Sequence, residues 1–302
     1  FSGSGVVSYL LKAMGKQVHA NDTLVFPSVI TSATVANNAT RLSETDLDFL
    51  LSSGAKTDTE RFIQTTFTGI FYTPAELASL DNLWAGIRRL ESPLKRSLAL
   101  AAMLRSAIKL QPRGLFTVSD PTRYMDGRRD LQLTIREHFV EQVQAYNAAV
   151  FSNGMNNSVT CGDVLNVKPG SDLVYMDPPY VPLSDDNCYM KRYHFLEGLA
   201  CYWEGKEIMM NTKVRKIAKP FTPFSYRHTA IDAFDRLFRH FADSVQVLSY
   251  SSNAYPDLET LQNLMGRYRK HVEVLEKEHR YHFGTHSRAK RNLVREYLII
   301  GL

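Results

Sequence analysis

Short apolar runs separated by longer amphipathic stretches set the pattern of this chain. The clearest run, residues 173–176, is apolar and is followed at once by turn residues. A run of this length next to turn signals is typical of a buried strand. Residues 17–22, 158–161 and 245–250 are also predicted to be strands. Stretches between them place apolar residues three or four positions apart, which predicts helices and an α/β fold.

Helical spacing dominates between about Ser43 and Phe151. Residues 73–76, Thr-Pro-Ala-Glu, have the form of a capping box with proline at the first helical position. Ser92-Pro93 has a similar start, and a looser helical spacing begins at Asp130. We therefore predict a largely helical domain over residues 43–151, inserted between two strands of a sheet.

The remaining residues, 1–42 and 152–302, are predicted to form the domain that contains the sheet. Its C-terminal half continues the alternation of helices and strands. Helices are predicted to begin near Tyr193, Thr229 and Pro256, and a last pair of strands is predicted at residues 272–275 and 295–300.

The N-terminal residues, Phe1-Ser2-Gly3-Ser4-Gly5, contain a Gly-x-Gly turn before a predicted helix. After a strand, such a turn lets the backbone approach a nucleotide-like ligand, with the N-terminus of the next helix pointing at it. We expect that strand upstream of Phe1, in the middle of the sheet. The alternative interpretation is a simple turn without a ligand.

Two acidic residues follow predicted strands. Asp22 ends the strand at residues 17–22, and an acid in this position suits the hydroxyl pair of a ribose. Asp163 follows the strand at residues 158–161, where it could accept a hydrogen bond from the amino group of an adenine ring. For Asp163 an Asx-turn is an equally good interpretation.

The motif Asp177-Pro178-Pro179-Tyr180 directly follows the apolar run at residues 173–176. Because proline cannot donate to a sheet ladder, the strand must stop here, at the end where open α/β sheets place their ligands. The carboxylate and the Pro178 carbonyl can accept hydrogen bonds from one amino group. The tyrosine ring can stack on a heterocycle. The motif therefore predicts a pocket for an exocyclic amine on a planar base.

Two basic segments contain aromatic residues and turn residues. Arginine on a loop suits phosphate oxygens and guanine edges. The alternative is a solvated loop with local pairs between aspartate and arginine. The candidate DNA contacts are Arg113, Arg123, Arg128 and Arg129 in the first segment and Arg288, Lys290 and Arg291 in the second.

Composition narrows the class of protein. The 302 residues are 44% hydrophobic and 22% charged, enough for a sizeable core. The net charge of +5 favours a polyanionic partner. No apolar run approaches a membrane span and no signal peptide is evident, so we expect no membrane partner. The cysteines are widely spaced and odd in number, which favours a reducing cytoplasm. The three cysteines form no C-x-x-C zinc pattern, and we expect no metal.

Taken together, these motifs resemble the D12 class, or alpha group, of DNA adenine-N6 methyltransferases, which includes Dam-like enzymes and many restriction-system methylases. Residues 1–5 look like the F-x-G-x-G cofactor motif of that family, and residues 177–180 match its D-P-P-Y motif. Asn21-Asp22, Gly162-Asp163 and residues 248–253 fall where the family has its other strand-end motifs. The resemblance covers nearly the whole chain, but the family's first strand and a further cofactor motif would lie upstream of Phe1.

The resemblance implies a doubly wound, mostly parallel Rossmann-like sheet with an antiparallel last strand, and a helical target-recognition domain. It implies S-adenosylmethionine as cofactor, double-stranded DNA as substrate and, in a restriction-modification system, a cognate endonuclease as partner. A target adenine would be flipped out of the duplex for direct methyl transfer. The implied cofactor-binding residues are Phe1, Ser2, Gly3, Ser4, Gly5, Asp22, Asp163 and Asp177, and the implied catalytic residues are Asp177, Pro178, Pro179 and Tyr180.

Other functions remain open from the sequence. The same fold could act on cytosine N4, RNA adenine or a protein glutamine, although aspartate at position 177 favours adenine in this family. A nicotinamide-dependent dehydrogenase would also use Gly-x-Gly and Asp22, but Ser8 stands where its third glycine is expected. A non-catalytic DNA-binding protein would use the basic loops and leave the D-P-P-Y motif unexplained.

Overall fold

The computed structural model describes residues 1–52, 61–120, 126–181, 189–280 and 293–302. The chain divides into two compact units. Unit 1 consists of Phe1, Asp163–Tyr189 and Pro220–Leu302, and unit 2 consists of Ser2–Gly162 and Met190–Lys219.

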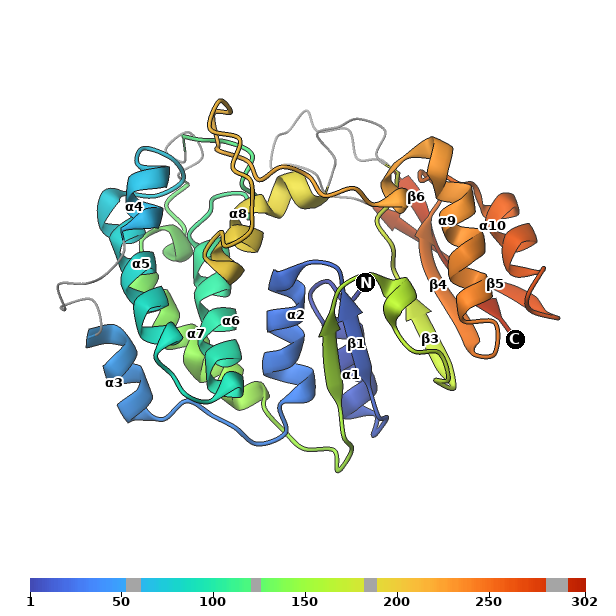
Figure 1. Cartoon of the computed structure of the whole chain (residues 1–302), viewed down its shortest axis with the longest axis horizontal. Helices are drawn as coiled ribbons and strands as arrows, with labels where there is room; N and C mark the ends of the chain where they lie inside the picture. The colour runs from blue at the N-terminus through green and yellow to red at the C-terminus, as the bar shows by residue number, and fades with distance from the viewer. Residues whose placement is uncertain (53–60, 121–125, 182–188, 281–292) are drawn as a thin grey trace. The chain divides into compact units, whose positions relative to one another are not determined.

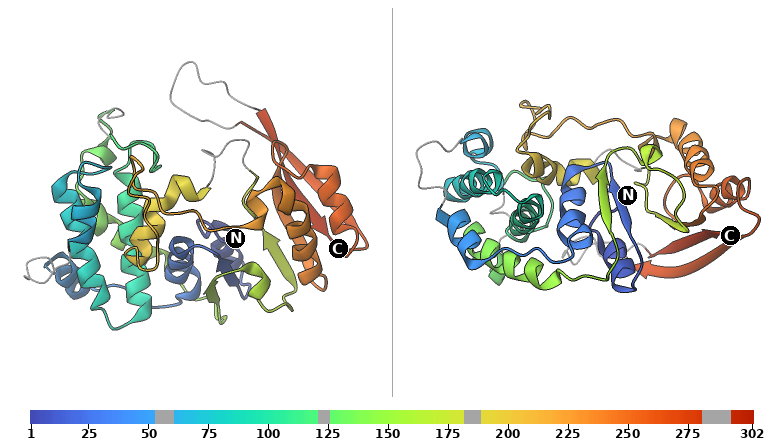
Figure 2. Two further views of the ribbon diagram at one scale, coloured as in Figure 1. Left: turned by 45° about the horizontal axis from the view of Figure 1, so that its top comes forward. Right: turned by 60° about the horizontal axis from the view of Figure 1, so that its bottom comes forward.

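Unit 1 is built on a sheet whose strands lie in the order β3-β4-β6-β5. β3 and β4 are parallel, whereas β6 runs antiparallel to both β4 and β5 (Figures 1 and 2). The fold is therefore mixed α/β, with an antiparallel strand pair joined to parallel strands, as the sequence predicts. The strands are β3 (Leu173–Met176), β4 (Val245–Ser251), β5 (Val272–Arg280) and β6 (Leu293–Gly301).

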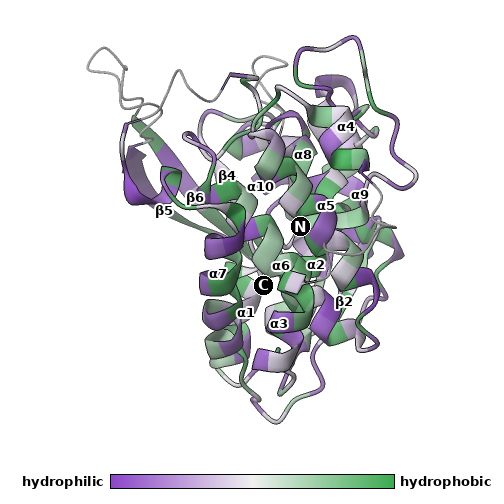
Figure 3. Cartoon of the chain, turned by 90° about the vertical axis from the view of Figure 1, so that its left-hand side faces the viewer, coloured by the Kyte–Doolittle hydropathy of each residue, from purple (hydrophilic) through white to green (hydrophobic). Residues whose placement is uncertain are grey.

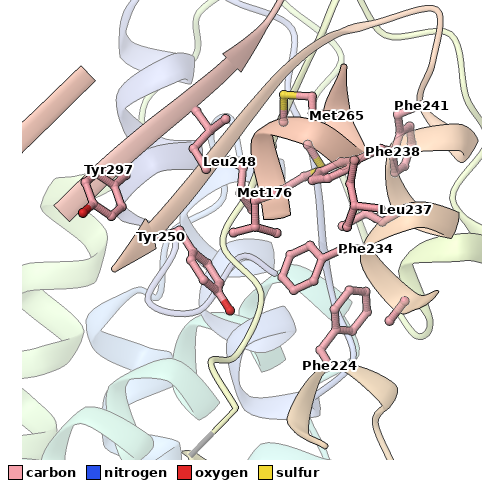
Figure 4. Close-up of a cluster of buried hydrophobic side chains, with 14 residues drawn as sticks. Met176, Phe224, Phe234, Leu237, Phe238, Phe241, Leu248, Tyr250, Met265 and Tyr297 are labelled. Atoms are coloured by element: carbon pink, nitrogen blue, oxygen red, sulfur yellow. The ribbon is translucent and has the colours of Figure 1, made fainter. Parts of the chain in front are cut away.

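Two helices, α9 (Arg227–His240) and α10 (Leu258–Met265), pack against this sheet. Apolar residues recur along α9 at helical spacing, which buries Phe234 and Phe238 on one side of the helix. Burial alternates along β4, so that Leu248 and Tyr250 point to the same side. Figure 4 shows these side chains together in one apolar cluster, which forms the core beneath the end of β3.

β5 lies at one edge of the sheet and is largely exposed. Its residues are mostly hydrophilic, as Figure 3 shows, and Glu276, Lys277 and Glu278 follow one another there. Charged side chains on an edge strand disfavour pairing with another chain. The polar character of β5 is thus consistent with its position.

Unit 2 contains the parallel pair β1 (His19–Asp22) and β2 (Ser158–Cys161), with His19 opposite Ser158. α1 (Val6–Ala13) precedes β1 in the chain, and α2 (Val25–Thr31) follows it. α2 continues directly into a π-helical turn at Ser32–Ala36. β1 therefore ends three residues before a helix begins, and Asp22 lies at this junction.

Helices make up most of the rest of unit 2. The described part of residues 43–151 is helical, as predicted, and contains no strand. Buried aromatic rings, including those of Phe67, Phe195 and Trp203, pack against one another in this unit. The helices are α3 (Glu44–Ser52), α4 (Phe62–Phe67), α5 (Pro74–Arg88), α6 (Pro93–Lys109), α7 (Ile135–Ala149) and α8 (Tyr189–Cys201). In the part of the chain that the structure describes, none of the helices is long and apolar enough to cross a membrane.

Helix boundaries differ from the sequence prediction where local and tertiary interactions compete. Glu76 does not complete the predicted capping box, because its carboxylate accepts a hydrogen bond from the backbone N–H of Ile135 at 2.7 Å. α7 begins at Ile135 rather than Asp130, behind a full capping box of Thr134 and Glu137. α8 begins at Tyr189 rather than Tyr193 and ends before Trp203.

The start of α2 is held by a buried carboxylate from α8. Glu197 is fully buried, and its Oε2 accepts hydrogen bonds from the N–H groups of Val25 at 2.8 Å and Phe26 at 3.2 Å, in the first turn of α2. Its Oε1 is 2.7 Å from the Nζ of Lys206. An anion at a helix N-terminus satisfies backbone donors and complements the helix dipole. Glu197 thereby fixes where α2 starts, directly after Asp22.

We expect Glu197→Ala to lower the free energy of unfolding by about 3 kcal/mol, because two backbone donors and Lys206 lose a buried partner. Urea denaturation followed by circular dichroism measures this change. Glu204→Ala is the matched control, since Glu204 also pairs with a basic residue, Arg88, but its side chain is 71% exposed. The control should change stability by less than about 1 kcal/mol. Equal losses in the two variants would contradict the role given to Glu197.

Candidate active site

The Gly-x-Gly turn adopts a backbone that only glycine accepts without strain. Gly3 has φ 51° and Gly5 has φ 78°, and Gly5 is the N-cap residue of α1. The Gly5 N–H donates to the Ser2 carbonyl at 2.8 Å, which closes the turn. A Cβ atom at Gly5 would lie 2.9 Å from Cγ2 of Thr31. Both the conformation and the packing therefore require glycine at position 5.

Asp22 ties this turn to the end of β1. Its Oδ2 accepts a hydrogen bond from the Gly3 N–H at 2.9 Å, and its Oδ1 accepts one from the Leu24 N–H at 3.0 Å. The Ser2 N–H donates to the carbonyl of Asn21 at 2.9 Å. Only 8% of Asp22 is exposed. A carboxylate has about four acceptor positions, so Asp22 holds the turn and retains capacity for further donors.

A hydroxyl group in the same turn lacks a partner. The Oγ atom of Ser2 is buried and makes no hydrogen bond to any residue that the structure describes. Buried polar atoms in folded proteins are rarely unpaired, and the missing partner is often a water molecule or a ligand. The orphaned Ser2 hydroxyl, the glycine backbone and Asp22 therefore form a polar cradle suited to a nucleotide-like molecule.

Asp177 lies directly after β3 in unit 1. Its side chain keeps access to solvent. The surrounding protein nonetheless removes much of the water near the carboxyl group, and this desolvation raises the pKa of Asp177 to about 6. The negative charge of Glu296 raises this pKa further. Near neutral pH, Asp177 is therefore mostly an accessible carboxylate with an increased affinity for protons.

Tyr180 lies on the apolar core of unit 1. Its ring makes an edge-to-face contact with Tyr250, with 5.0 Å between the ring centroids. Tyr250 in turn contacts Phe234, which contacts Phe224, and Phe224 contacts the ring of Phe1 at 5.3 Å. The series begins at Tyr180 of the D-P-P-Y motif and ends at Phe1 of the F-x-G-x-G motif. Edge-to-face pairs of this kind favour defined ring orientations, so the core presents Tyr180 in a fixed position.

The rest of the D-P-P-Y motif is held more deeply. Pro178 is buried and Pro179 is half-buried.

Asp163, in the same unit, is exposed, and its Oδ1 accepts a hydrogen bond from the Leu165 N–H at 2.9 Å. Asp163 thus caps the short 3-10 turn at Val164–Asn166. The Asx-turn interpretation describes this local structure, and the contact of Asp163 with an adenine ring stays a prediction.

The candidate DNA-binding arginines have different surroundings. Arg128 is paired with Asp126 at 3.0 Å and also donates to the carbonyl of Pro112. Arg129 is paired with Glu141. Arg113 is exposed. The local acid–arginine pairs of the alternative interpretation are therefore present. The remaining candidates, Arg123, Arg288, Lys290 and Arg291, lie outside the described residues.

Two residues near these arginines are structural. Phe116, which the sequence places among the arginines, is fully buried and stacks on Phe195 with the ring centroids 5.0 Å apart. His194 is also buried, and one ring nitrogen lies 3.0 Å from the Phe116 carbonyl. Desolvation lowers the pKa of His194 to about 4, so its ring is neutral. Both belong to the core that supports the loop carrying Arg113.

Metal-ligating groups do not gather in the part of the chain that is described: no three His, Cys, Asp or Glu residues there could hold a metal ion. Cys161 and Cys201 are free thiols, and Cys188 lies outside the described residues. Among the described residues, the two motifs and Asp22 offer carboxylates, backbone donors and aromatic rings to a ligand.

Comparison with known proteins gives the class of protein. The family profile of the D12 class N6 adenine-specific DNA methyltransferases matches residues 1–251. This match spans well over half of the chain, so the chain belongs to that family and is a DNA adenine methyltransferase. Methyltransferases of this family use S-adenosylmethionine as methyl donor. This family assignment decides against the other functions that the sequence left open: methylation of cytosine, RNA or protein, hydride transfer, and DNA binding without catalysis.

Two methylases are similar to this chain over nearly its whole length. The Type II methyltransferase M2.HphI of Haemophilus parahaemolyticus is 29% identical over 297 residues, which cover 93% of this chain and 83% of the relative. The modification methylase LlaI of Lactococcus lactis subsp. lactis is 24% identical over 309 residues, which cover 96% of this chain. The match covers 48% of LlaI, so this chain spans about half of that protein. No solved structure matches the chain.

Sequence reasoning passed over Tyr250 and Glu197. The sequence analysis places Tyr250 in a strand and in a strand-end motif but predicts no contact for its ring, which in the structure touches the D-P-P-Y tyrosine. Its position in Leu248-Ser249-Tyr250-Ser251-Ser252-Asn253, a strand-end motif, is the signal that could have identified it. Glu197 gives no such signal, because a glutamate within a helix is usually a surface residue.

The pKa of Asp177 leads to a prediction about pH. Because the carboxylate takes up a proton near pH 6, the form that accepts hydrogen bonds from an amine is lost as the pH falls. We expect the single-turnover rate of adenine methylation to fall by about tenfold for each pH unit below about 6. Methylation measured between pH 5 and pH 8, with circular dichroism to monitor folding, tests this expectation.

Asp177→Asn is the control for the pH dependence. Its residual methylation rate should show no titration between pH 5 and pH 8, because the side chain no longer ionises. If the variant keeps the same fall below pH 6, another group is responsible for the pH dependence.

Proposed function

We propose that the chain methylates N6 of an adenine extruded from duplex DNA, with Asp177, Pro178 and Tyr180 holding the base. The observation that carries the proposal is the carboxylate of Asp177 at the end of β3. Solvent can reach this carboxylate, yet the surrounding protein raises its pKa. The two prolines and the Tyr180 ring follow it directly. Asp177 and the Pro178 carbonyl accept hydrogen bonds from the N6 amine. Tyr180 stacks on the base, a contact worth about 1–3 kcal/mol.

The acceptor groups also account for the direction of transfer. Hydrogen bonds to both protons of the amine draw its lone pair away from the ring and toward the methyl donor, and positioning of this kind is a major source of rate. The new nitrogen–carbon bond forms as the sulfur–carbon bond breaks, and the bonding electron pair stays on sulfur. The amine then carries one surplus proton. A carboxylate with a pKa near 6 can accept that proton, and its exposure lets it pass the proton to solvent.

The donor is S-adenosylmethionine, which supplies an electrophilic methyl group on a sulfonium. Residues 1–5 and Asp22 fit such a molecule: the turn lacks Cβ atoms at Gly3 and Gly5, the Ser2 hydroxyl has no partner among the described residues, and Asp22 retains acceptor capacity. Gly3, Ser4 and Gly5 would contact the donor through their backbone, and Asp22 would accept hydrogen bonds from its ribose hydroxyls. Asp163 and Asp177 would contribute the remaining polar contacts.

The helical segment supplies recognition in this proposal. Residues 43–151 would form the target-recognition domain, and residues 1–42 and 152–302 the catalytic domain with a Rossmann-like, doubly wound sheet. Arg113 is exposed in this segment, and Arg128 and Arg129 can exchange their surface ion pairs for phosphate contacts, since such pairs contribute only about 0–1 kcal/mol. Arg123, Arg288, Lys290 and Arg291 would add contacts from outside the described residues.

The relatives favour a restriction-modification role. A methyltransferase of such a system protects host DNA at the sites that a partner endonuclease cleaves. We infer the same task for this chain, with a cognate endonuclease as functional partner and the cytoplasm of a bacterium, an archaeon or a phage-infected cell as its place of action. Methylation of a mixed-sequence plasmid, followed by sequencing that detects modified bases, tests activity, base and site together.

Asp177→Ala is expected to lower the methylation rate by at least about a thousandfold, because the amine loses its charged acceptor and the positioning that this acceptor provides. The measurement is single-turnover transfer of a labelled methyl group to the plasmid. Binding of S-adenosylmethionine, followed by calorimetry, should change little. Retained activity would rule out the role given to this carboxylate.

Gly5→Ala is expected to weaken the binding of S-adenosylmethionine by about tenfold or more. An alanine at φ 78° costs roughly 1–2 kcal/mol, and its Cβ would meet Cγ2 of Thr31. That side chain cannot yield easily, because its hydroxyl donates to the carbonyl of Pro27 at 2.9 Å. Calorimetric titration measures the change in affinity.

Gly15→Ala is the matched control for Gly5→Ala. Gly15 has φ 76°, and a Cβ there would meet nothing within 4 Å. The control imposes the same backbone strain away from the turn, so the affinity for S-adenosylmethionine should be unchanged. An equal loss of affinity in both variants would show that general destabilisation, rather than the geometry of the turn, weakens binding.

A further inference from the structure

An aromatic and basic surface in unit 1 has no role in the site described above. It is formed by the corner before α9 and the first turn of that helix. Phe221 is 68% exposed, and its ring stacks on Tyr226 with an interplanar angle of 12° and 5.4 Å between the centroids. Arg227 and His228 follow and are both exposed. We name Phe221, Tyr226, Arg227 and His228 the α9 corner.

The α9 corner departs from the usual chemistry of a helix start. Helices favour acidic side chains in their first turn and a polar side chain at the N-cap. α9 instead has Tyr226 at its N-cap, which makes no side-chain capping bond to the described residues, and its first turn contains Arg227 and His228 but no acid. The positive charge of Arg227 therefore stands at the positive end of the helix dipole. Local departures from sequence rules of this kind are expected at functional or strained sites.

The corner is built rigidly. The hydroxyl of Thr229 donates to the carbonyl of Pro223 at 2.7 Å, and the Ser225 N–H donates to the Thr222 carbonyl at 3.1 Å. Phe224, in the middle of the corner, is buried in the apolar cluster of Figure 4, where its ring contacts Phe234. These contacts hold the backbone between Phe221 and Arg227.

A short series of contacts connects the corner to the D-P-P-Y tyrosine. The Arg227 guanidinium lies 4.1 Å from the centroid of the Tyr255 ring. The Tyr255 carbonyl accepts a hydrogen bond from the hydroxyl of Tyr250, and the Tyr250 ring contacts Tyr180. The basic surface is therefore connected, through Tyr255 and Tyr250 of the same unit, to the ring that we assign to the target base.

We propose that the α9 corner binds the DNA strand beside the extruded adenine, with Arg227 on a phosphate and Phe221 stacked on an unpaired base. The inference rests on the proposed function. A DNA strand fits both features: a guanidinium suits phosphate oxygens, and a planar base can extend the stack of Phe221 on Tyr226. Extrusion of an adenine leaves neighbouring bases partly unstacked, and an aromatic face stabilises them regardless of sequence.

Equilibrium binding of a fluorescent duplex tests the proposal at several salt concentrations. The duplex carries the site identified by plasmid sequencing. Arg227→Ala should reduce the slope of log K against log salt by about 0.9, the value for one lost phosphate contact. Arg227→Lys should keep most of the slope, because it keeps the charge. Phe221→Ala should weaken binding roughly 5- to 150-fold with an unchanged slope.

Arg236→Ala is the matched control. Arg236 is exposed on the same helix, nine residues from Arg227 and so on the opposite side at about 100° per residue. It should leave both slope and affinity close to those of the wild type. The proposal is overturned if Arg227→Ala keeps the wild-type slope, if Arg236→Ala loses as much, or if Phe221→Ala binds normally, because the corner would then serve another partner or none.

Failure here is distinguishable from failure of the proposed function. If the wild type methylates the plasmid and depends on Asp177, but the corner variants bind DNA normally, only the role of the corner is wrong. If Asp177→Ala remains active, the assignment of the catalytic carboxylate fails whatever the corner variants do.

Discussion

Two consecutive prolines at the end of β3 impose the constraint on which the site depends. Pro178 and Pro179 cannot donate to the ladder that pairs β3 with β4, so the strand ends at Met176. The chain then leaves the sheet with a fixed φ at both prolines. Asp177 on one side and Tyr180 on the other are separated by this stiff segment. The carboxylate and the ring keep a defined spacing because the backbone between them has little freedom.

The two central carboxylates are prepared for different tasks by their surroundings. Asp22 accepts hydrogen bonds from the N–H groups of Gly3 and Leu24, so its first role is to hold the glycine turn at the end of β1. Asp177 has lost much of its water and has a pKa of about 6. The first acid is a fixed acceptor built into the backbone, whereas the second can respond to a proton near neutral pH. Asp22 thus holds the backbone in place, whereas Asp177 is the aspartate whose protonation changes near pH 6.

The apolar core of unit 1 also serves the site. Residues such as Phe234 and Tyr250 hold α9 on the sheet (Figure 4). The Tyr250 ring also contacts Tyr180, and the ring of Phe224, in the same cluster, contacts Phe1. A substitution in this cluster would change the stability of the unit and the orientation of the Tyr180 ring together. This coupling gives a physical reason for an aromatic, rather than aliphatic, core here, because ring pairs fix orientation as well as filling space.

Hydrogen bonds between residues distant in the sequence give two glutamates roles that local patterns do not predict. Glu76 is a good capping residue by sequence, yet its carboxylate bonds Ile135. Glu197, an acid within α8, holds the start of α2 from a position 172 residues away from Val25. Local patterns describe what a residue can do with its neighbours, and neither of these partners is a neighbour in the sequence.

The sequence by itself determined the strands that carry the motifs, the helical character of residues 43–151 and the residues of the D-P-P-Y and Gly-x-Gly motifs. These features depend on short-range physics: proline and glycine restrict the backbone, and apolar spacing selects helix or strand. Only the tertiary structure decided that Asp22 bonds Gly3, that Tyr250 supports Tyr180, that Phe116 is buried and that Asp177 is desolvated. Each of these depends on which distant segments pack together, and spacing along a chain does not encode that directly.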